Sequence, residues 1–162
     1  MSFDSAIAYV LANEGIDSND PADRGGRTRF GVTDHEAAAH GLDVVTLTLD
    51  QAKAIYRSDY WLPLFDQIVD QRIATKILDM GVNMGVLTSI RLLQVALGVP
   101  SDGVFGPVTL KSVNATAADV LLRELVEVSV RRYIRIVLSN HSQLVFLAGW
   151  AERAMRLPPE VA

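Results

Sequence analysis

Glu14 is the residue of this sequence best suited to acid chemistry. Apolar residues between Phe3 and Leu11 recur at helical spacing, and Glu14 falls inside the same stripe. Gly15 favours the end of the helix directly after it, so the carboxyl lies at the negative end of the helix dipole. Apolar surroundings and the dipole both disfavour the carboxylate, which predicts a raised pKa for Glu14. A carboxylic acid that stays protonated near neutral pH can act as a general acid.

A second carboxyl group follows in a polar run. Asp23 precedes Gly25-Gly26, which predicts a tight turn, and the residues from Thr28 to Thr33 predict a short strand. A helix-end acid that faces such a hairpin would form a two-sided cleft. The alternative for Glu14 is a helix-terminal glutamate that bends out to solvent.

Helix signals set the elements that must position these groups. Two capping boxes, at residues 33–36 and 48–51, predict helices over 34–41 and from 49 to about 59. Asp70 predicts the start of a central core helix with an apolar stripe from Ile73 to Met84. Further helices are expected over 88–98, from Pro107, over 117–138 and from Ser142. The sequence therefore predicts a mainly α fold, a helical bundle with one small β-hairpin next to the cleft.

Composition is that of an ordinary globular protein of one domain or two fused halves. The chain has 162 residues, of which 49% are hydrophobic and 21% charged. Its net charge of −4 lacks the positive excess that is typical of nucleic-acid-binding proteins, and the chain has no cysteine. His35 and His40 lack a second ligand at suitable spacing, so no metal site is expected. Neither a signal peptide nor an apolar stretch of the ~20 residues that cross a membrane is visible.

The order and spacing of the motifs resemble the N-acetylmuramidases of glycoside hydrolase family 108, which are lysozyme-like endolysins of phages and bacteria. The resemblance covers nearly the whole chain. The family usually has a second glycine and an aromatic residue after Glu-Gly, whereas this chain has Ile16-Asp17. The residues that carry the resemblance are Glu14-Gly15, Asp20-Pro21-Ala22-Asp23-Arg24-Gly25-Gly26, Thr28, Phe30-Gly31-Val32-Thr33, Ala54-Ile55-Tyr56, Tyr60-Trp61, Asp79-Met80-Gly81-Val82-Asn83-Met84-Gly85, Leu92-Leu93-Gln94-Val95-Ala96-Leu97, Asp102-Gly103, Gly106-Pro107-Val108-Thr109-Leu110 and Phe146-Leu147-Ala148-Gly149-Trp150.

The resemblance implies a lysozyme-like α+β fold in two parts. Residues 1–85 would form the glycoside hydrolase part, and residues 86–162 a helical peptidoglycan-binding-like part that packs with the first as one compact unit. The stretch 102–110 resembles the signature of small peptidoglycan-binding modules. A well-made turn between two helices would explain that stretch equally well.

In such an enzyme Glu14 would protonate the glycosidic oxygen between N-acetylmuramic acid and N-acetylglucosamine. Asp23 would stabilise the oxocarbenium-like transition state or orient a water, and Thr28 or Thr33 could hold that water. This scheme needs no metal and no organic cofactor. Inverting and retaining chemistry stay open, because the sequence does not give the separation of the two carboxyl groups.

Three further residues are candidates for contact with the substrate. Tyr60 and Trp61 could stack on sugar rings, or they could be half-buried core with a polar handle. Asn83 shares a helix face with Asp79, four residues earlier. That face could line the floor of the cleft, or Asn83 could bond a neighbouring backbone.

Peptidoglycan is the partner that the resemblance implies. The expectation is a monomer without stable membrane insertion, made in the host cytoplasm without a signal peptide and released to the cell wall by a holin. One alternative is a lytic transglycosylase, which would use Glu14 and could spare Asp23. The other is a non-catalytic wall-binding or secretion-accessory protein, which the Ile16-Asp17 departure and the lack of positive charge leave open. The helix dipole explains the basic patch of Arg131, Arg132 and Arg135 without a ligand, although a minor role against wall carboxylates or phosphates stays open.

Overall fold

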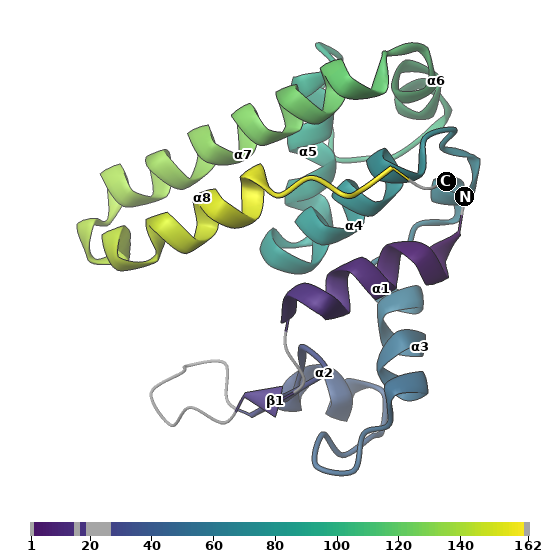
Figure 1. The fold of residues 1–162 in the computed structure, drawn as a ribbon, viewed down its shortest axis with the longest axis vertical. Coiled ribbons are helices and arrows are strands. Elements are labelled where there is room, and N and C mark those ends of the chain that lie inside the picture. The colour runs from purple at the N-terminus through teal and green to yellow at the C-terminus, as the bar shows by residue number, and fades with distance from the viewer. Residues whose placement is uncertain (1, 15–16, 19–26, 161–162) are drawn as a thin grey trace.

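The structure is a computed structural model that describes residues 2–14, 17–18 and 27–160 (Figure 1). These residues form eight α-helices, two short 3-10 helices and a three-stranded antiparallel sheet. The mainly α fold with a small β element, predicted from the sequence, is confirmed. Asp23 and the predicted turn at Gly25-Gly26 lie outside the described residues.

The elements follow one another with short connections. The N-terminal part contains α1 (Phe3–Glu14), β1 (Asp17–Ser18), β2 (Thr28–Arg29), β3 (Val32–Thr33), α2 (Asp34–Ala39), α3 (Leu49–Asp59), the 3-10 helix η1 (Pro63–Gln67) and α4 (Gln71–Met84). The C-terminal part contains α5 (Val86–Ala96), α6 (Pro107–Ala115), α7 (Ala118–Ser139), the 3-10 helix η2 (His141–Phe146) and α8 (Leu147–Met155).

Local signals place most of the helix starts. Thr33 and Thr48 each accept a hydrogen bond from the backbone of the residue three positions on, whose side chain bonds back, so both predicted capping boxes are confirmed. Asp70 caps α4 through the backbone N–H of Arg72, and Pro107 occupies the first turn of α6. Helices α2 and α3 therefore begin where the sequence predicts.

Two local predictions are wrong. The strand expected from Thr28 to Thr33 is instead a tight hairpin, because Phe30 and Gly31 have φ values of 52° and 77° and turn the chain back. The last helix begins at Leu147 and not at Ser142. Asn140 caps the segment at the backbone N–H of Ser142, but that segment winds as the 3-10 helix η2.

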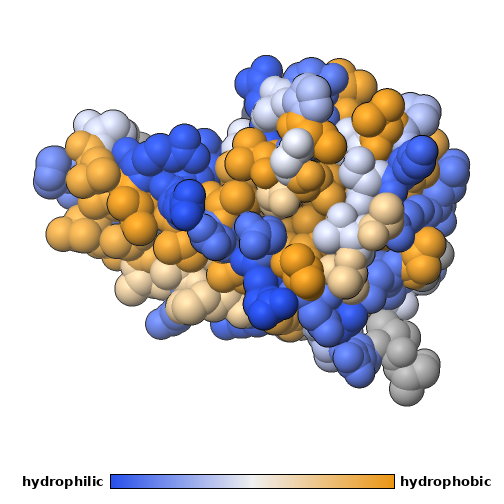
Figure 2. Space-filling model, turned by 90° about the horizontal axis from the view of Figure 1, so that it is seen from above, coloured by the Kyte–Doolittle hydropathy of each residue, from blue (hydrophilic) through white to orange (hydrophobic). Residues whose placement is uncertain are grey.

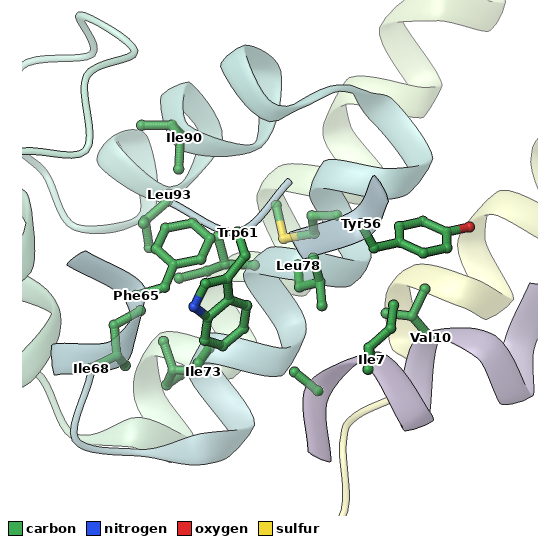
Figure 3. Close-up of a cluster of buried hydrophobic side chains, with 14 of the residues drawn as sticks. Ile7, Val10, Tyr56, Trp61, Phe65, Ile68, Ile73, Leu78, Ile90 and Leu93 are labelled. Atoms are coloured by element: carbon green, nitrogen blue, oxygen red, sulfur yellow. The ribbon is translucent and has the colours of Figure 1, made fainter. Parts of the chain in front are cut away.

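The core is organised around α4. This helix packs against α1, α5 and α7, and its residues from Ile73 to Gly81 are all buried. Figure 3 shows the aromatic part of this core, where Trp61 and Phe65 lie among Ile73, Leu78 and other apolar side chains. The buried cluster runs from Ala6 to Val128, so it joins helices of the N-terminal and C-terminal parts.

Helices α7 and α8 form a hairpin that projects from the body of the molecule (Figure 1). They pack against each other and against η2. Tyr133 of α7 stacks on Trp150 of α8 at 5.3 Å between ring centroids, and Phe146 stacks on Trp150 at 5.7 Å. No described helix is long and apolar enough to cross a bilayer.

Candidate active site

The end of α1, which carries Glu14, is anchored by the segment after α8. Arg156 Nη1 donates a hydrogen bond to Asn13 Oδ1 at 2.5 Å. The Tyr9 hydroxyl donates to the backbone carbonyl of Arg156 at 3.1 Å. Glu14 is the last residue of α1, as predicted, and its side chain lies outside what the structure describes.

The small sheet places two predicted site residues opposite each other. Thr28 of β2 pairs with Thr33 of β3, and directly opposed residues of an antiparallel pair point to the same face of a sheet. Ser18 of β1 pairs with Thr28 from the other side. The sheet thus begins three residues after Glu14 and presents two threonines on one face.

The two threonines differ in what holds their hydroxyl groups. Thr33 Oγ1 lies 2.8 Å from Glu36 Oε2 and accepts from the Glu36 backbone N–H, so it is occupied by the capping box. Among the described residues, no hydrogen bond engages the Thr28 hydroxyl. The capping box thus uses the Thr33 hydroxyl to shape the start of α2.

Buried groups of α3 fix the turn of the hairpin. Tyr56 is a core residue whose hydroxyl donates to the Phe30 carbonyl at 3.0 Å. Arg29 bonds the Val45 carbonyl through Nη1, and Val32 is buried beneath the sheet. Because both strands are only two residues long, these contacts rather than the ladder hold the sheet in position.

Glu36 joins Thr33 to Tyr60. Its Oε1 accepts from the Tyr60 hydroxyl at 2.5 Å, while its Oε2 accepts from the Thr33 backbone N–H at 2.9 Å. The structure thus brings two of the predicted substrate-binding residues together through a carboxylate. The sequence identified Glu36 only as a capping residue, because nothing local shows that Tyr60, 24 positions away, reaches the same side chain.

Trp61 is a core residue and not a sugar-stacking platform, which corrects its assignment as substrate-binding. It is only 4% exposed and packs edge-on against Phe3 and Phe65, at 5.5 Å from each. Its indole N–H donates to Asp66 at 3.0 Å, so its polar handle is satisfied within the protein. Of the adjacent aromatic pair, Tyr60 alone remains partly exposed.

Asn83 bonds a side chain of the projecting α7–α8 hairpin, which we call the arm, and not a neighbouring backbone. Its Nδ2 donates to the Tyr133 hydroxyl at 2.8 Å, which ties the end of α4 to α7. Asp79, on the same helix, is buried and bonded to Arg153 of α8 at 2.9 Å. Burial raises the pKa of the Tyr133 hydroxyl above its usual value. The Asp79–Asn83 motif thus connects α4 to both helices of the arm.

A buried lysine completes this connection. Lys76 has no exposed surface, and its Nζ donates to the carbonyls of Ala154 and Arg156 at 2.8 and 3.0 Å. Asp79 Oδ2 lies 3.8 Å from the same nitrogen. Burial lowers the pKa of Lys76 to about 8, an effect that Asp79 opposes. One signal in the sequence indicates this burial, since Lys76 stands in the apolar stripe three residues after Ile73.

Comparison with known proteins finds two family matches, one in each half of the chain. Residues 7–85 match the family described as glycosyl hydrolase 108, and residues 88–155 match the one described as a predicted peptidoglycan domain. The chain combines these two domains. The resemblance stated from the sequence is thereby confirmed, and the pair of matches supports a peptidoglycan hydrolase.

A solved structure supports the same conclusion for the fold. The chain is similar to Brucella abortus SagA at a TM-score of 0.71 and 28% sequence identity, over 94% of this chain and 93% of that chain. The lysozyme-like α+β fold expected from the sequence is confirmed. No curated protein matches the chain.

Proposed function

We propose that this protein is an N-acetylmuramidase that cleaves the β-1,4 bond between N-acetylmuramic acid and N-acetylglucosamine in peptidoglycan. The observation that carries the proposal is the position of Glu14. It ends α1 of the glycosyl hydrolase 108 domain, three residues before a sheet that presents Thr28 and Thr33 on one face. A general acid beside polar groups that can hold water is the minimum that glycoside hydrolysis requires.

In the proposed reaction Glu14 donates a proton to the glycosidic oxygen as the bond to C1 of N-acetylmuramic acid breaks. Asp23 stabilises the positive charge that develops at C1 or orients the water that attacks it. Thr28 holds that water, since the hydroxyl of Thr33 is bonded to Glu36. The products are a reducing N-acetylmuramic acid end and a free 4-hydroxyl on N-acetylglucosamine, so no cofactor is consumed.

The first test is mass spectrometry of the soluble fragments released from purified Gram-negative peptidoglycan. Fragments that end in reducing N-acetylmuramic acid are expected. Anhydro ends, lighter by one water, would assign the chain to the lytic transglycosylases. Binding to the sacculi without any soluble fragment would assign it to non-catalytic wall-binding or secretion-accessory proteins.

Variants of the two carboxyl residues test the proposed roles. Glu14→Gln should keep its melting temperature and lose at least about 100-fold in rate, because the acid is gone while the shape remains. Glu152→Gln, a matched change at an exposed position of α8, should retain full activity. Asp23→Ala should also lose most activity, whereas near-full activity of that variant would contradict the hydrolase roles.

We further propose that the enzyme acts as an endolysin that degrades the host wall after a holin opens the inner membrane. This role follows from the family resemblance of the sequence. Expression of the full chain in Escherichia coli should leave cells intact until a holin or a membrane-permeabilising agent is added. Lysis without either agent would contradict release by a holin, and it should be absent for Glu14→Gln in all conditions.

A further inference from the structure

The free end of the α7–α8 arm carries an exposed apolar cluster. We call it the hairpin tip. Figure 2 shows apolar side chains gathered at this end of the molecule. Each of its members is more than half exposed, with Val145 the most exposed at 79%, so the fold leaves them in water. Contiguous exposed apolar side chains mark surfaces that meet a partner or a lipid. The hairpin tip consists of Leu138, Leu144, Val145 and Phe146.

The tip is held rigidly. Phe146 stacks on Trp150, which in turn stacks on Tyr133, so the apolar turn is braced against both helices of the arm. Asn140 accepts hydrogen bonds from the backbone N–H and the hydroxyl of Ser142 and so fixes the start of η2. The apolar side chains therefore sit on a preformed projection at the end of the arm (Figure 1).

Positive charge flanks the tip. Arg131 and Arg135 lie on the same face of α7 as Ile134 and Leu138, at helical spacings of three and four residues. The part of the arm next to the tip, residues 131–146, contains three arginines and no acidic residue, whereas the whole chain carries a net charge of −4. Glu127 pairs with Arg131, and such an exposed pair contributes little because water screens it.

The apolar surface continues from the arm toward α5. A groove of about 550 Å³ lies between α5 and α7, and its rim contains the same two arginines. Its lining combines aliphatic side chains with these cations, a pairing that suits a molecule with an apolar part and an anionic part. The lining residues are Leu92, Val95, Val128, Arg131, Ile134 and Arg135.

We infer that the α7–α8 arm binds peripherally to an anionic phospholipid surface, with the hairpin tip in the interfacial region and Arg131 and Arg135 on lipid phosphates. Apolar side chains beside arginines are the arrangement by which surface elements bind anionic membranes. A second copy of the chain fits less well. A symmetric contact through this face would bring the arginines of the two copies together, and like charges repel.

This inference does not depend on the proposed glycosidase role. It adds a means of keeping the chain at the membrane face of the wall, where the substrate lies within reach. Binding of this kind is reversible, and it requires no helix that spans the bilayer.

Flotation of the full chain with lipid vesicles tests the inference. Vesicles of phosphatidylcholine mixed with phosphatidylglycerol should bind the protein, and vesicles of phosphatidylcholine alone should bind it at least about tenfold more weakly. Leu144→Ser/Val145→Ser should weaken binding to anionic vesicles about tenfold or more. Arg131→Gln/Arg135→Gln should weaken it by about 25-fold, at roughly fivefold for each arginine, and should reduce its sensitivity to salt.

Val69→Ser is the matched control, because Val69 is 70% exposed in the segment between η1 and α4, outside the arm. It should bind vesicles like the wild type. All variants should keep their melting temperature and their activity on purified, membrane-free peptidoglycan, so failure of the lipid proposal stays distinct from failure of the muramidase proposal. Equal binding by Leu144→Ser/Val145→Ser, or equal binding to neutral and anionic vesicles, would overturn the inference. Dimerisation that Val145→Ser abolishes, without lipid binding, would assign the tip to a second copy.

Discussion

Arg156 bonds Asn13 although 143 positions separate them in the chain. Its guanidinium donates to the side chain directly before Glu14, and its backbone carbonyl accepts from Tyr9 and Lys76. The end of α1 is thereby fixed by the segment after α8, in the C-terminal part of the chain. The C-terminal helices thus help to position the residue that we propose as the acid.

Arg156→Met should lower kcat on purified peptidoglycan by about tenfold, with a smaller change in KM. A hydrogen bond to a charged group contributes about 1.5–3 kcal/mol, and 1.4 kcal/mol corresponds to a factor of ten in rate. Arg156→Lys should recover part of the loss because the cation is kept. The control is Arg123→Met on the exposed face of α7, which should have wild-type rates. A lower melting temperature with unchanged kcat would make the contact purely structural.

Lys76→Met should destabilise the protein by about 3 kcal/mol at pH 7. Removal of one member of a buried ionic cluster leaves its partners uncompensated, which typically costs about 3–5 kcal/mol. Here the orphaned groups are the α8 carbonyls and Asp79, which keeps its bond to Arg153. Urea denaturation with far-UV circular dichroism measures the difference. A loss below about 1 kcal/mol would show that the ammonium contributes little.

The same lysine predicts a dependence of stability on alkaline pH. Burial lowers the pKa of Lys76 to about 8 in the folded protein, and an unfolded lysine titrates near its ordinary value of about 10.4. Between these values the unfolded chain binds more protons, so the contribution of Lys76 to stability rises with pH, by at most about 1.4 kcal/mol per pH unit.

Wild type and Lys76→Met should therefore diverge as the pH rises from 8 to 9.5, with the wild type gaining about 1–2 kcal/mol relative to the variant. Burial raises the pKa values of Tyr9 and Tyr133, so these groups titrate above this window. Lys111→Met, at an exposed site, should show no such divergence from the wild type. A constant difference between wild type and Lys76→Met would contradict the lowered pKa.

Trp61→Phe should reduce stability and leave substrate affinity unchanged. The indole packs on Phe3 and Phe65 and donates to Asp66, so the smaller ring leaves a cavity and costs about 2 kcal/mol. Tyr60→Phe, the matched aromatic change at the neighbouring position, removes the bond to Glu36 and keeps the ring. For both variants, thermal melts measure the loss of stability, and KM on purified peptidoglycan measures any loss of substrate affinity. A raised KM for Trp61→Phe with an unchanged melting temperature would restore its assignment to the substrate site.

Local signals were enough to predict where α2, α3 and α4 begin. The boxes at Thr33 and Thr48 and the cap at Asp70 act within three residues, so the sequence contains the whole interaction. The turn at Phe30 and Gly31 was missed because an aromatic residue seldom adopts positive φ. Tertiary contacts hold that turn, chiefly the bond from Tyr56 to the Phe30 carbonyl.

From the sequence, a site residue could be proposed only where its own side-chain type and position indicate a chemical role. Glu14 is proposed from its type and its place in the helix. Tyr60 is partly exposed and Trp61 is buried although they are neighbours in the chain. The packing of η1 and α1 decides which ring is buried, and the sequence does not show it. The bond from Arg156 to Asn13 joins opposite ends of the chain, and neither residue carries a local pattern that indicates it.

Gln94 holds the turn at residues 102–110. This stretch either contacts peptidoglycan or only connects two helices, and replacement of Gln94 distinguishes these two interpretations. The side chain is buried. Its Nε2 lies within 2.6–3.3 Å of Asp102 Oδ1, the Val104 carbonyl and Thr109 Oγ1. Its Oε1 accepts from the Gly103 backbone N–H at 2.8 Å, where φ is +82°.

Gln94→Leu should cost about 2–3 kcal/mol and lower the melting temperature by roughly 5–10 °C, because it removes one partner and leaves the backbone groups of the turn unpaired. Gln67→Leu, at an exposed position, should leave the melting temperature unchanged. Binding of both variants to purified peptidoglycan should be measured below their melting temperatures. Weaker binding by Gln94→Leu alone would mean that the turn contacts the wall. Unchanged binding with a lower melting temperature would make it a connection between α5 and α6, with wall recognition located elsewhere in the chain.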